Sequence, residues 1–125
     1  MMKLNEKILN QLRYGKSSSG RVGCKVSATG DNKNNHAWIS IQMIKGADLS
    51  TEIIKEWFIA YEVEYIELDE KYNEEEYGMD VDLLLLRKEH FYNIKNVGEL
   101  ERTLRKWIDD FSIIEPISNV GHPIY

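Results

Sequence analysis

The sequence predicts an α+β fold: an antiparallel sheet of four to five strands with two to three helices packed on it. Three observations predict this class. Residues 22–28 and 37–44 alternate apolar and polar side chains around a polar turn, as paired strands do. Apolar residues recur with helical spacing near both ends of the chain. The length of 125 residues fits a single domain spanning 1–125, large enough to bury roughly two-thirds of the surface of its unfolded chain.

An amphipathic helix is predicted from Leu4 to Tyr14, because apolar residues recur there every three or four positions. Gly15 is a suitable residue to end it. The GKSSSG that follows looks like the end of a phosphate-binding loop, but Asn10 stands where that motif has its first glycine. We therefore expect a linker here and no nucleotide site.

The two alternating segments predict a β-hairpin, joined by the polar sequence TGDNKNN. With the turn centred near Asn32, Cys24 lies opposite Ser40 and His36 lies opposite Ala28. The thiol and the nearest imidazole are then not neighbours, so a Cys–His nucleophile is not expected. Cys24 is predicted to be a small buried hydrophobic residue.

A helix is predicted to start at Thr51, capped by Asp48 or Ser50, and to run to about Tyr61. A strand with one carboxylate face is predicted to follow it, because β-branched and aromatic residues are dense there. The apolar spacing also permits a second interpretation, in which the helix continues to about Tyr72.

A loop is predicted over residues 70–78, followed by a strand from Met79 to Arg87. The run of four leucines at 83–86 favours a central, buried strand. Residues 89–95 are interpreted as a short strand or an irregular segment.

The clearest helix is predicted from Val97 to Phe111, with apolar residues on one side. Asn96 is its predicted cap, and Glu99 stands three residues later, where a capping box places a glutamate. The segment from Ile113 to Tyr125 contains both prolines of the chain and is expected to be an edge strand or a loose tail.

No catalytic residue, cofactor or metal is expected. His36, His90 and His122 have no metal-ligand spacing, and the single Cys24 cannot complete a zinc site or an internal disulfide. The longest apolar run is far shorter than a membrane span, and no signal sequence is recognisable at the start. These features predict a cytoplasmic protein without a membrane partner.

Charge is strongly segregated along the chain. Residues 48–82 contain 13 acidic and two basic residues, so their net charge is −11, whereas the remainder of the chain is net +6. Such separation attracts a cationic partner and disfavours nucleic acid. Tyrosines and aliphatic residues interrupt the acids, which predicts a folded acidic face rather than a disordered tail. The predicted partner-binding residues are Glu62, Glu64, Tyr65, Glu67, Asp69, Tyr72, Glu74, Glu75, Glu76, Tyr77, Asp80 and Asp82.

These tyrosines have two interpretations. They are core and rim aromatics of an α+β domain, or they are contact residues that anchor a partner while the carboxylates steer it.

In size, charge and its acidic, tyrosine-containing middle, the chain resembles the immunity proteins of bacterial contact-dependent and polymorphic toxin systems. The resemblance implies a small cytoplasmic protein, not an enzyme, that binds and neutralises a cognate basic toxin domain, commonly a nuclease, by occluding its cationic groove. A monomer or weak homodimer is expected.

Three alternatives remain open. The first is a phage-encoded nucleic-acid mimic that inhibits a host nuclease or defence complex. The second is a small-ligand-binding domain or enzyme, in which the hairpin and the last helix frame a pocket. The third is a self-associating structural domain, favoured if Trp38 and Ile44 are exposed.

Overall fold

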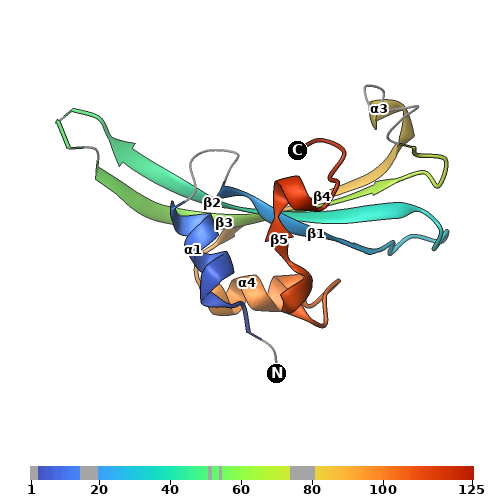
Figure 1. The fold of residues 1–125 in the computed structure, drawn as a ribbon, viewed down its shortest axis with the longest axis horizontal. Coiled ribbons are helices and arrows are strands. Elements are labelled where there is room, and N and C mark those ends of the chain that lie inside the picture. The colour runs from blue at the N-terminus through green and yellow to red at the C-terminus, as the bar shows by residue number, and fades with distance from the viewer. Residues whose placement is uncertain (1–2, 15–19, 51, 54, 74–80) are drawn as a thin grey trace.

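A computed structural model describes residues 3–14, 20–50, 52–53, 55–73 and 81–125. It contains one antiparallel sheet with the strand order β4-β3-β2-β1-β5, and three helices, which confirms the predicted α+β class (Figure 1). The strands are β1 (Val22–Ser27), β2 (His36–Asp48), β3 (Lys55–Leu68), β4 (Leu85–Ile94) and β5 (Glu115–Pro116). The helices are α1 (Glu6–Tyr14), α3 (Val81–Leu84) and α4 (Val97–Leu104), with short 3-10 turns η2 (Phe111–Ile113) and η3 (Ile117–Asn119).

The main hydrophobic core lies between the sheet and helices α1 and α4, which cover the same face (Figure 1). We call this side of the sheet the helical face. A buried hydrogen bond also ties the start of the chain to α4, because the Leu4 backbone N–H donates to Glu101 Oε2 at 2.8 Å. Core residues with no more than 2% exposure include Leu12, Val22, Ile39, Ile41, Val63, Tyr65, Leu100, Leu104, Ile108 and Phe111.

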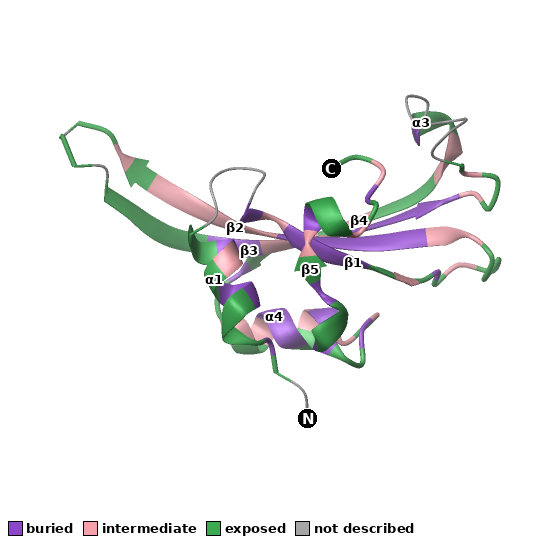
Figure 2. Ribbon diagram, in the orientation of Figure 1, coloured by how far each residue is buried: buried purple, intermediate pink, exposed green. Residues whose placement is uncertain are grey.

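The opposite side, which we call the second face, carries a smaller core. Trp38, Ile66 and Leu68 of the sheet are buried there together with Val81 of α3, and Val120 of the C-terminal segment packs against them. Figure 2 shows buried residues on the strands and on α3. The Trp38 indole N–H donates to the Val120 carbonyl at 3.3 Å, which holds that segment against the sheet. The start of β2 and the end of β3 are therefore covered on both sides, and Trp38 is not exposed.

The predicted hairpin of β1 and β2 is confirmed, but its register differs by one residue. Cys24 pairs with Ile39, and His36 pairs with Ser27. Cys24 is 2% exposed on the helical face, and burial raises the pKa of its thiol to about 12. The thiol is thus protonated at neutral pH, as expected of a small buried residue.

The predicted helix from Thr51 to Tyr61 is wrong in the described residues, because β3 already begins at Lys55. The spacing of its apolar residues fits both a helix and a strand. The strand forms because β3 pairs with β2 along a long ladder that begins with Asp48 opposite Lys55. Asp48 does not cap a helix. Its Oδ1 accepts hydrogen bonds from the backbone N–H of Ser50 at 2.9 Å and from its hydroxyl at 2.6 Å. The predicted strand after Tyr61 is confirmed.

The prediction of a central strand from Met79 to Arg87 is wrong for residues 81–84 and for the central position. Residues 85–87 do belong to a strand, and residues 79–80 lie outside the described ranges. Residues 81–84 form the short helix α3, and β4 lies at the edge of the sheet. Leu83 and Leu86 are consequently 81% and 56% exposed. An apolar run does not distinguish a central strand from an edge strand, because the position of a strand depends on the order of strands in the sheet.

The last predicted helix is shorter than expected. The side chain of Asn96 caps α4 by accepting from the Glu99 backbone N–H at 2.9 Å, as predicted. The helix ends at Leu104, and Phe111 belongs to a separate 3-10 turn whose side chain still reaches the core. In the following segment, β5 pairs with β1 as an edge strand.

The β2–β3 hairpin extends well beyond its neighbours as a projecting arm, which we define as the described residues 45–50, 52–53 and 55–58 (Figure 1). Pairing of β1 with β2 ends at Ile41, and pairing of β4 with β3 ends at Tyr61. None of the helices in the described ranges has the length and apolarity needed to cross a bilayer.

Candidate functional site

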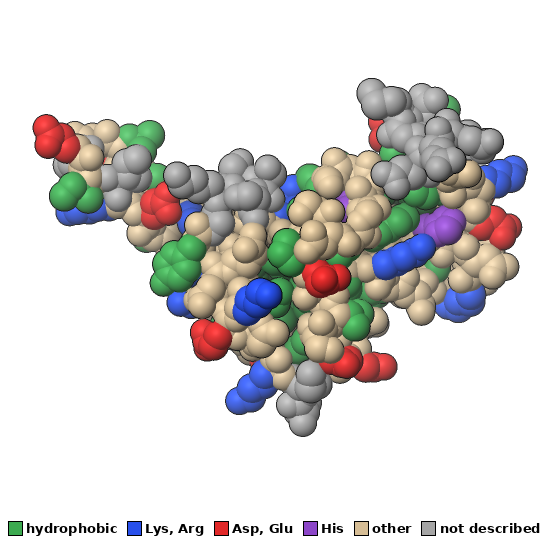
Figure 3. All heavy atoms as spheres, in the orientation of Figure 1, with side chains coloured by type: hydrophobic (Ala, Val, Ile, Leu, Met, Phe, Trp, Pro, Cys, Tyr) green, Lys and Arg blue, Asp and Glu red, His purple; other side chains and the backbone are tan. Residues whose placement is uncertain are grey.

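Strand β3 divides the predicted acidic face between the two sides of the sheet. Successive side chains of a strand point to opposite faces. Glu62 and Glu64 therefore lie on the second face, whereas Tyr65 and Glu67 lie on the helical face with the buried Val63. Figure 3 likewise shows acidic and basic side chains interspersed over the visible side of the molecule. The described carboxylates of this stretch do not form a single outward face.

Tyr65 and Glu67 are internal groups that hold the β1–β2 loop. Tyr65 is fully buried, and its ring stacks on Trp107 with centroids 5.7 Å apart. Glu67 is 4% exposed and accepts hydrogen bonds from Asn35 Nδ2 at 2.9 Å and from the Gly30 backbone N–H at 3.3 Å. Their burial leaves these two predicted contact residues without a surface to offer a partner.

The environment of Glu67 keeps it ionised. Burial works to raise the pKa of this carboxyl, but hydrogen bonds from Tyr65, Asn35 and Gly30 and the charge of Arg87 together outweigh it. The pKa of Glu67 is therefore below its ordinary value.

Asp69, Glu70, Tyr72 and Asp82 lie near one end of the sheet. Asp69 accepts from the Lys71 backbone N–H at 2.9 Å, and Glu70 is exposed and accepts from Asn32 Nδ2 at 3.2 Å. Tyr72 is half-buried, with its ring centroid 5.8 Å from that of Trp38, so it belongs to the second-face core. Asp82 is exposed on α3. The remaining predicted residues lie outside the described ranges; they are Glu74, Glu75, Glu76, Tyr77 and Asp80.

Glu62 and Glu64 meet in a polar cavity on the second face, with a volume of about 180 Å³. The sheet register brings its walls together, because Gln42 pairs with Glu62 on one side and His90 pairs with Glu64 on the other. Five further residues complete the lining: Arg21, Ser40, Gln42, His90 and Tyr125.

The two glutamates are partnered unequally. Glu62 Oε2 accepts from Gln42 Nε2 at 2.8 Å and lies 3.3 Å from His90 Nε2. Glu64 Oε2 lies 3.7 Å from Lys88 Nζ, a loose ion pair. Glu64 Oε1 is buried and has no hydrogen-bond partner among the described residues, although the Glu64 side chain as a whole is 14% exposed.

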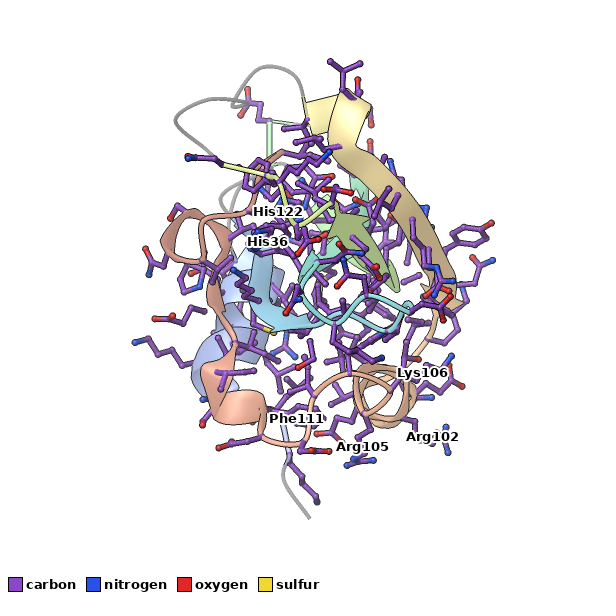
Figure 4. The ribbon with its side chains drawn as sticks, turned by 90° about the vertical axis from the view of Figure 1, so that its right-hand side faces the viewer. His36, Arg102, Arg105, Lys106, Phe111 and His122 are labelled. Carbon is purple, nitrogen blue, oxygen red and sulfur yellow. The ribbon has the colours of Figure 1, made fainter. Side chains whose placement is uncertain are left out.

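The C-terminal segment forms the rim of this cavity. The Arg21 guanidinium donates to Gln42 Oε1 at 2.6 Å and stacks 3.7 Å above the ring of Tyr125. His122 lies behind this rim and is 7% exposed. Burial first, and then the charge of Arg21, lower the pKa of His122 to about 4, so the ring is neutral at pH 7. Figure 4 shows His36 and His122 on this side of the sheet, away from Arg102, Arg105 and Lys106.

Sequence analysis selected Glu62 and Glu64 but missed the other walls of the cavity. The alternation of β2 indicates that Gln42 shares a face with Ser40, so this part was accessible from the pattern. Arg21 and Tyr125 are distant in the sequence, and only the folding of the C-terminal segment brings them together.

The cavity is suited to binding rather than to nucleophilic chemistry. It presents carboxylate oxygens that accept hydrogen bonds, and the only thiol, Cys24, lies on the opposite face of the sheet. Within the described ranges no three His, Cys, Asp or Glu side chains gather closely enough to hold a metal ion.

Comparison with protein-family models, with curated proteins and with solved structures finds no match to this chain.

Proposed function

We propose that the chain is a binding protein that neutralises a basic protein partner in the cytoplasm, as the resemblance to immunity proteins implies, and that the second face of the sheet contacts this partner. The observation that carries the proposal is the unpartnered Oε1 of Glu64 beside Glu62 in an open polar cavity. A buried acceptor left without a donor costs about 1–3 kcal/mol. A lysine or arginine side chain of the partner supplies the missing donor.

Long-range charge supports the same partner. The chain has a net charge of −5, so it attracts a basic domain before contact. The acidic groups at the end of the sheet, Asp69, Glu70 and Asp82, then add favourable charge at the periphery. Exposed charges of this kind mainly increase the association rate, whereas a desolvated pair at Glu64 mainly slows dissociation.

A nucleic-acid mimic is less well supported than an inhibitor with one anchoring cavity. Such a mimic needs a continuous row of unpaired carboxylates, but Glu67 is buried and Lys88 lies beside Glu64. The small-ligand alternative needs an enclosed pocket. A second groove of about 580 Å³ lies at the base of the arm, but Tyr14 and Phe58 on its walls are 71% and 42% exposed, so it would leave a small ligand largely in solvent.

The proposal is tested by capture of partners from native lysate at low and moderate salt, followed by mass spectrometry. We expect one dominant basic protein, whose activity falls when the chain is added in equimolar amount. Binding to the purified partner is then compared between the natural chain, Glu64→Gln and the control Asp109→Asn, which removes an equal charge from an exposed site.

We expect Glu64→Gln to weaken binding by about tenfold, mainly through faster dissociation, and Asp109→Asn to leave it unchanged. Equal affinities for all three chains would show that the cavity of Glu62 and Glu64 does not contact the partner. Capture of an acidic partner, or of nucleic acid, would overturn the proposed function itself.

A further inference from the structure

The arm leaves both of its long edges without a neighbouring strand in the described part of the chain. On the outer side of β3, pairing with β4 begins only at Tyr61, so the backbone from Lys55 to Phe58 has no strand beside it. The register of β2 and β3 shifts next to this segment, which leaves Ile59 out of the pairing. Unpaired edges of this kind are templates for another strand.

Large apolar side chains on the arm are exposed. Leu49 and Ile53 near its end are 73% and 75% exposed, and Trp57, which lines the groove at its base, is 53% exposed. The Trp57 indole lies across Gly46 on the paired strand, so close that a Cβ added at Gly46 would overlap the ring. The backbone of Gly46 thus holds the indole flat against the arm, and an ordered apolar surface faces solvent.

A groove of about 580 Å³ lies where the arm joins the rest of the molecule. Its apolar walls include Tyr14, Phe58 and Tyr61, and the last two rings have centroids 5.0 Å apart. Three basic residues but only one acidic residue, Glu56, line it. The basic residues of the groove are Arg13, Lys45 and Lys95.

The end of the arm has the opposite character. The described residues 48–50 and 52–53, which we call the tip, carry two acids, Asp48 and Glu52, and no base. They also carry the two most exposed large apolar residues of the arm, Leu49 and Ile53. Figure 3 shows acidic and apolar side chains at the end of the arm, with basic side-chain atoms next to them, where Lys55 pairs with Asp48. The tip is therefore complementary to the groove in both charge and hydrophobicity.

We infer that two copies of this chain associate through their arms. A two-fold axis places the free edges of the two β3 strands side by side in antiparallel fashion along Lys55–Phe58. Antiparallel pairing brings the end of one arm to the base of the other, so each tip lies over the partner's groove. Glu52 then faces Lys95 of the other copy, and Trp57 is covered.

This interface does not use the surface proposed for the basic partner. The cavity of Glu62 and Glu64 lies on the second face beyond Tyr61, outside the arm. Nor is it the self-association considered from the sequence, which required exposed Trp38 and Ile44; Trp38 is 3% exposed and Ile44 is half-buried. The dimer and the binding of a basic partner are thus independent of each other.

The test is sedimentation equilibrium of the full chain over a range of concentrations up to about 1 mM. We expect a reversible monomer–dimer equilibrium. Each single charge reversal, Glu52→Lys or Lys95→Glu, should raise the dimer dissociation constant by about tenfold, and the double variant should restore most of the affinity. Lys7→Glu, an exposed reversal on α1, is the matched control and should change nothing.

A measurement on the natural chain complements the variants. Every second backbone amide of residues 55–58, namely those whose N–H points away from β2, should exchange more slowly with solvent as the concentration rises, because a partner strand then accepts their hydrogen bonds. A chain that is monomeric at about 1 mM contradicts the inference. So does a dimer whose affinity neither reversal alters, or one in which the double variant is no tighter than the single variants.

Discussion

The hydroxyl of Tyr65 lies 2.6 Å from Oε1 of Glu67, two residues further along the same strand, and donates a hydrogen bond to it. The Tyr65 oxygen also accepts from the Thr29 backbone N–H at 3.0 Å. Tyr65 and Glu67, which the sequence predicts to contact a partner, thus make internal hydrogen bonds that hold the β1–β2 loop to β3.

Removing the hydroxyl should loosen that loop. We expect Tyr65→Phe to lower the free energy of unfolding by about 1–2 kcal/mol, because the buried Glu67 carboxylate loses a donor and the Thr29 N–H loses an acceptor. Urea unfolding measures the change. Tyr14→Phe, at a residue that is 71% exposed, should cost less than about 0.5 kcal/mol; an equal loss in both variants would contradict the internal role of Tyr65.

Stability should fall in mildly acidic solution because of His122. The pKa of this side chain is about 4 in the folded chain and 6.5 ordinarily, so the unfolded state binds the proton first as the pH falls. The resulting stability is fully present above pH 6.5 and is lost progressively down to pH 4. This shift in the pKa of His122 contributes up to about 3 kcal/mol to the free energy of unfolding at neutral pH.

The contribution of His122 is obtained by comparing two chains, with and without this histidine, because other groups titrate in the same pH range. The free energy of unfolding is measured from pH 7 to pH 4 for the natural chain and for His122→Asn. We expect the natural chain to lose stability more steeply than His122→Asn between pH 6.5 and pH 4. Parallel curves would show that His122 is accessible to protons in the folded chain.

Glu64 and Glu62 should respond in opposite ways to replacement by leucine. Glu64→Leu removes a buried acceptor without a partner and fills an adjoining cavity, so we expect the isolated chain to gain about 1 kcal/mol of stability. Glu62→Leu leaves Gln42 Nε2 without its acceptor and should cost about 1 kcal/mol. Thermal unfolding distinguishes them. A loss of stability in Glu64→Leu would show that this glutamate supports the fold.

Two glycines should differ sharply when replaced by alanine. A Cβ at Gly23 would overlap the backbone carbonyl of Ile39 and lie 2.8 Å from Cδ1 of Ile117, so the pairing of β1 with β2 must shift. We expect Gly23→Ala to cost about 2–3 kcal/mol. Gly98→Ala on α4 meets only Asn96 Oδ1 at 3.3 Å and should be neutral or stabilising by up to about 1 kcal/mol. Chemical unfolding of both variants checks the contrast.

Elements specified by local chemistry were predictable. The capping of α4 by Asn96 was predictable because its side chain accepts a hydrogen bond from the backbone N–H of Glu99, only three residues later. The hairpin follows from two alternating segments, although the length of its turn shifted the register by one residue. The same alternation, applied to a strand that includes Glu62, Glu64 and Glu67, predicts that Glu62 and Glu64 share one face and that Glu67 lies on the other.

The amino-acid sequence by itself determined the α+β class, the helix at α1, the β1–β2 hairpin and the acidic middle of the chain, because each depends on side chains close together in the sequence. Tertiary structure decided whether residues 55–61 are helix or strand, since their apolar spacing fits both periods and only the long partner strand β2 selects one. It also decided that Tyr65 and Glu67 are internal. The walls of the Glu64 cavity come from segments as distant as Arg21 and Tyr125, which no local pattern connects.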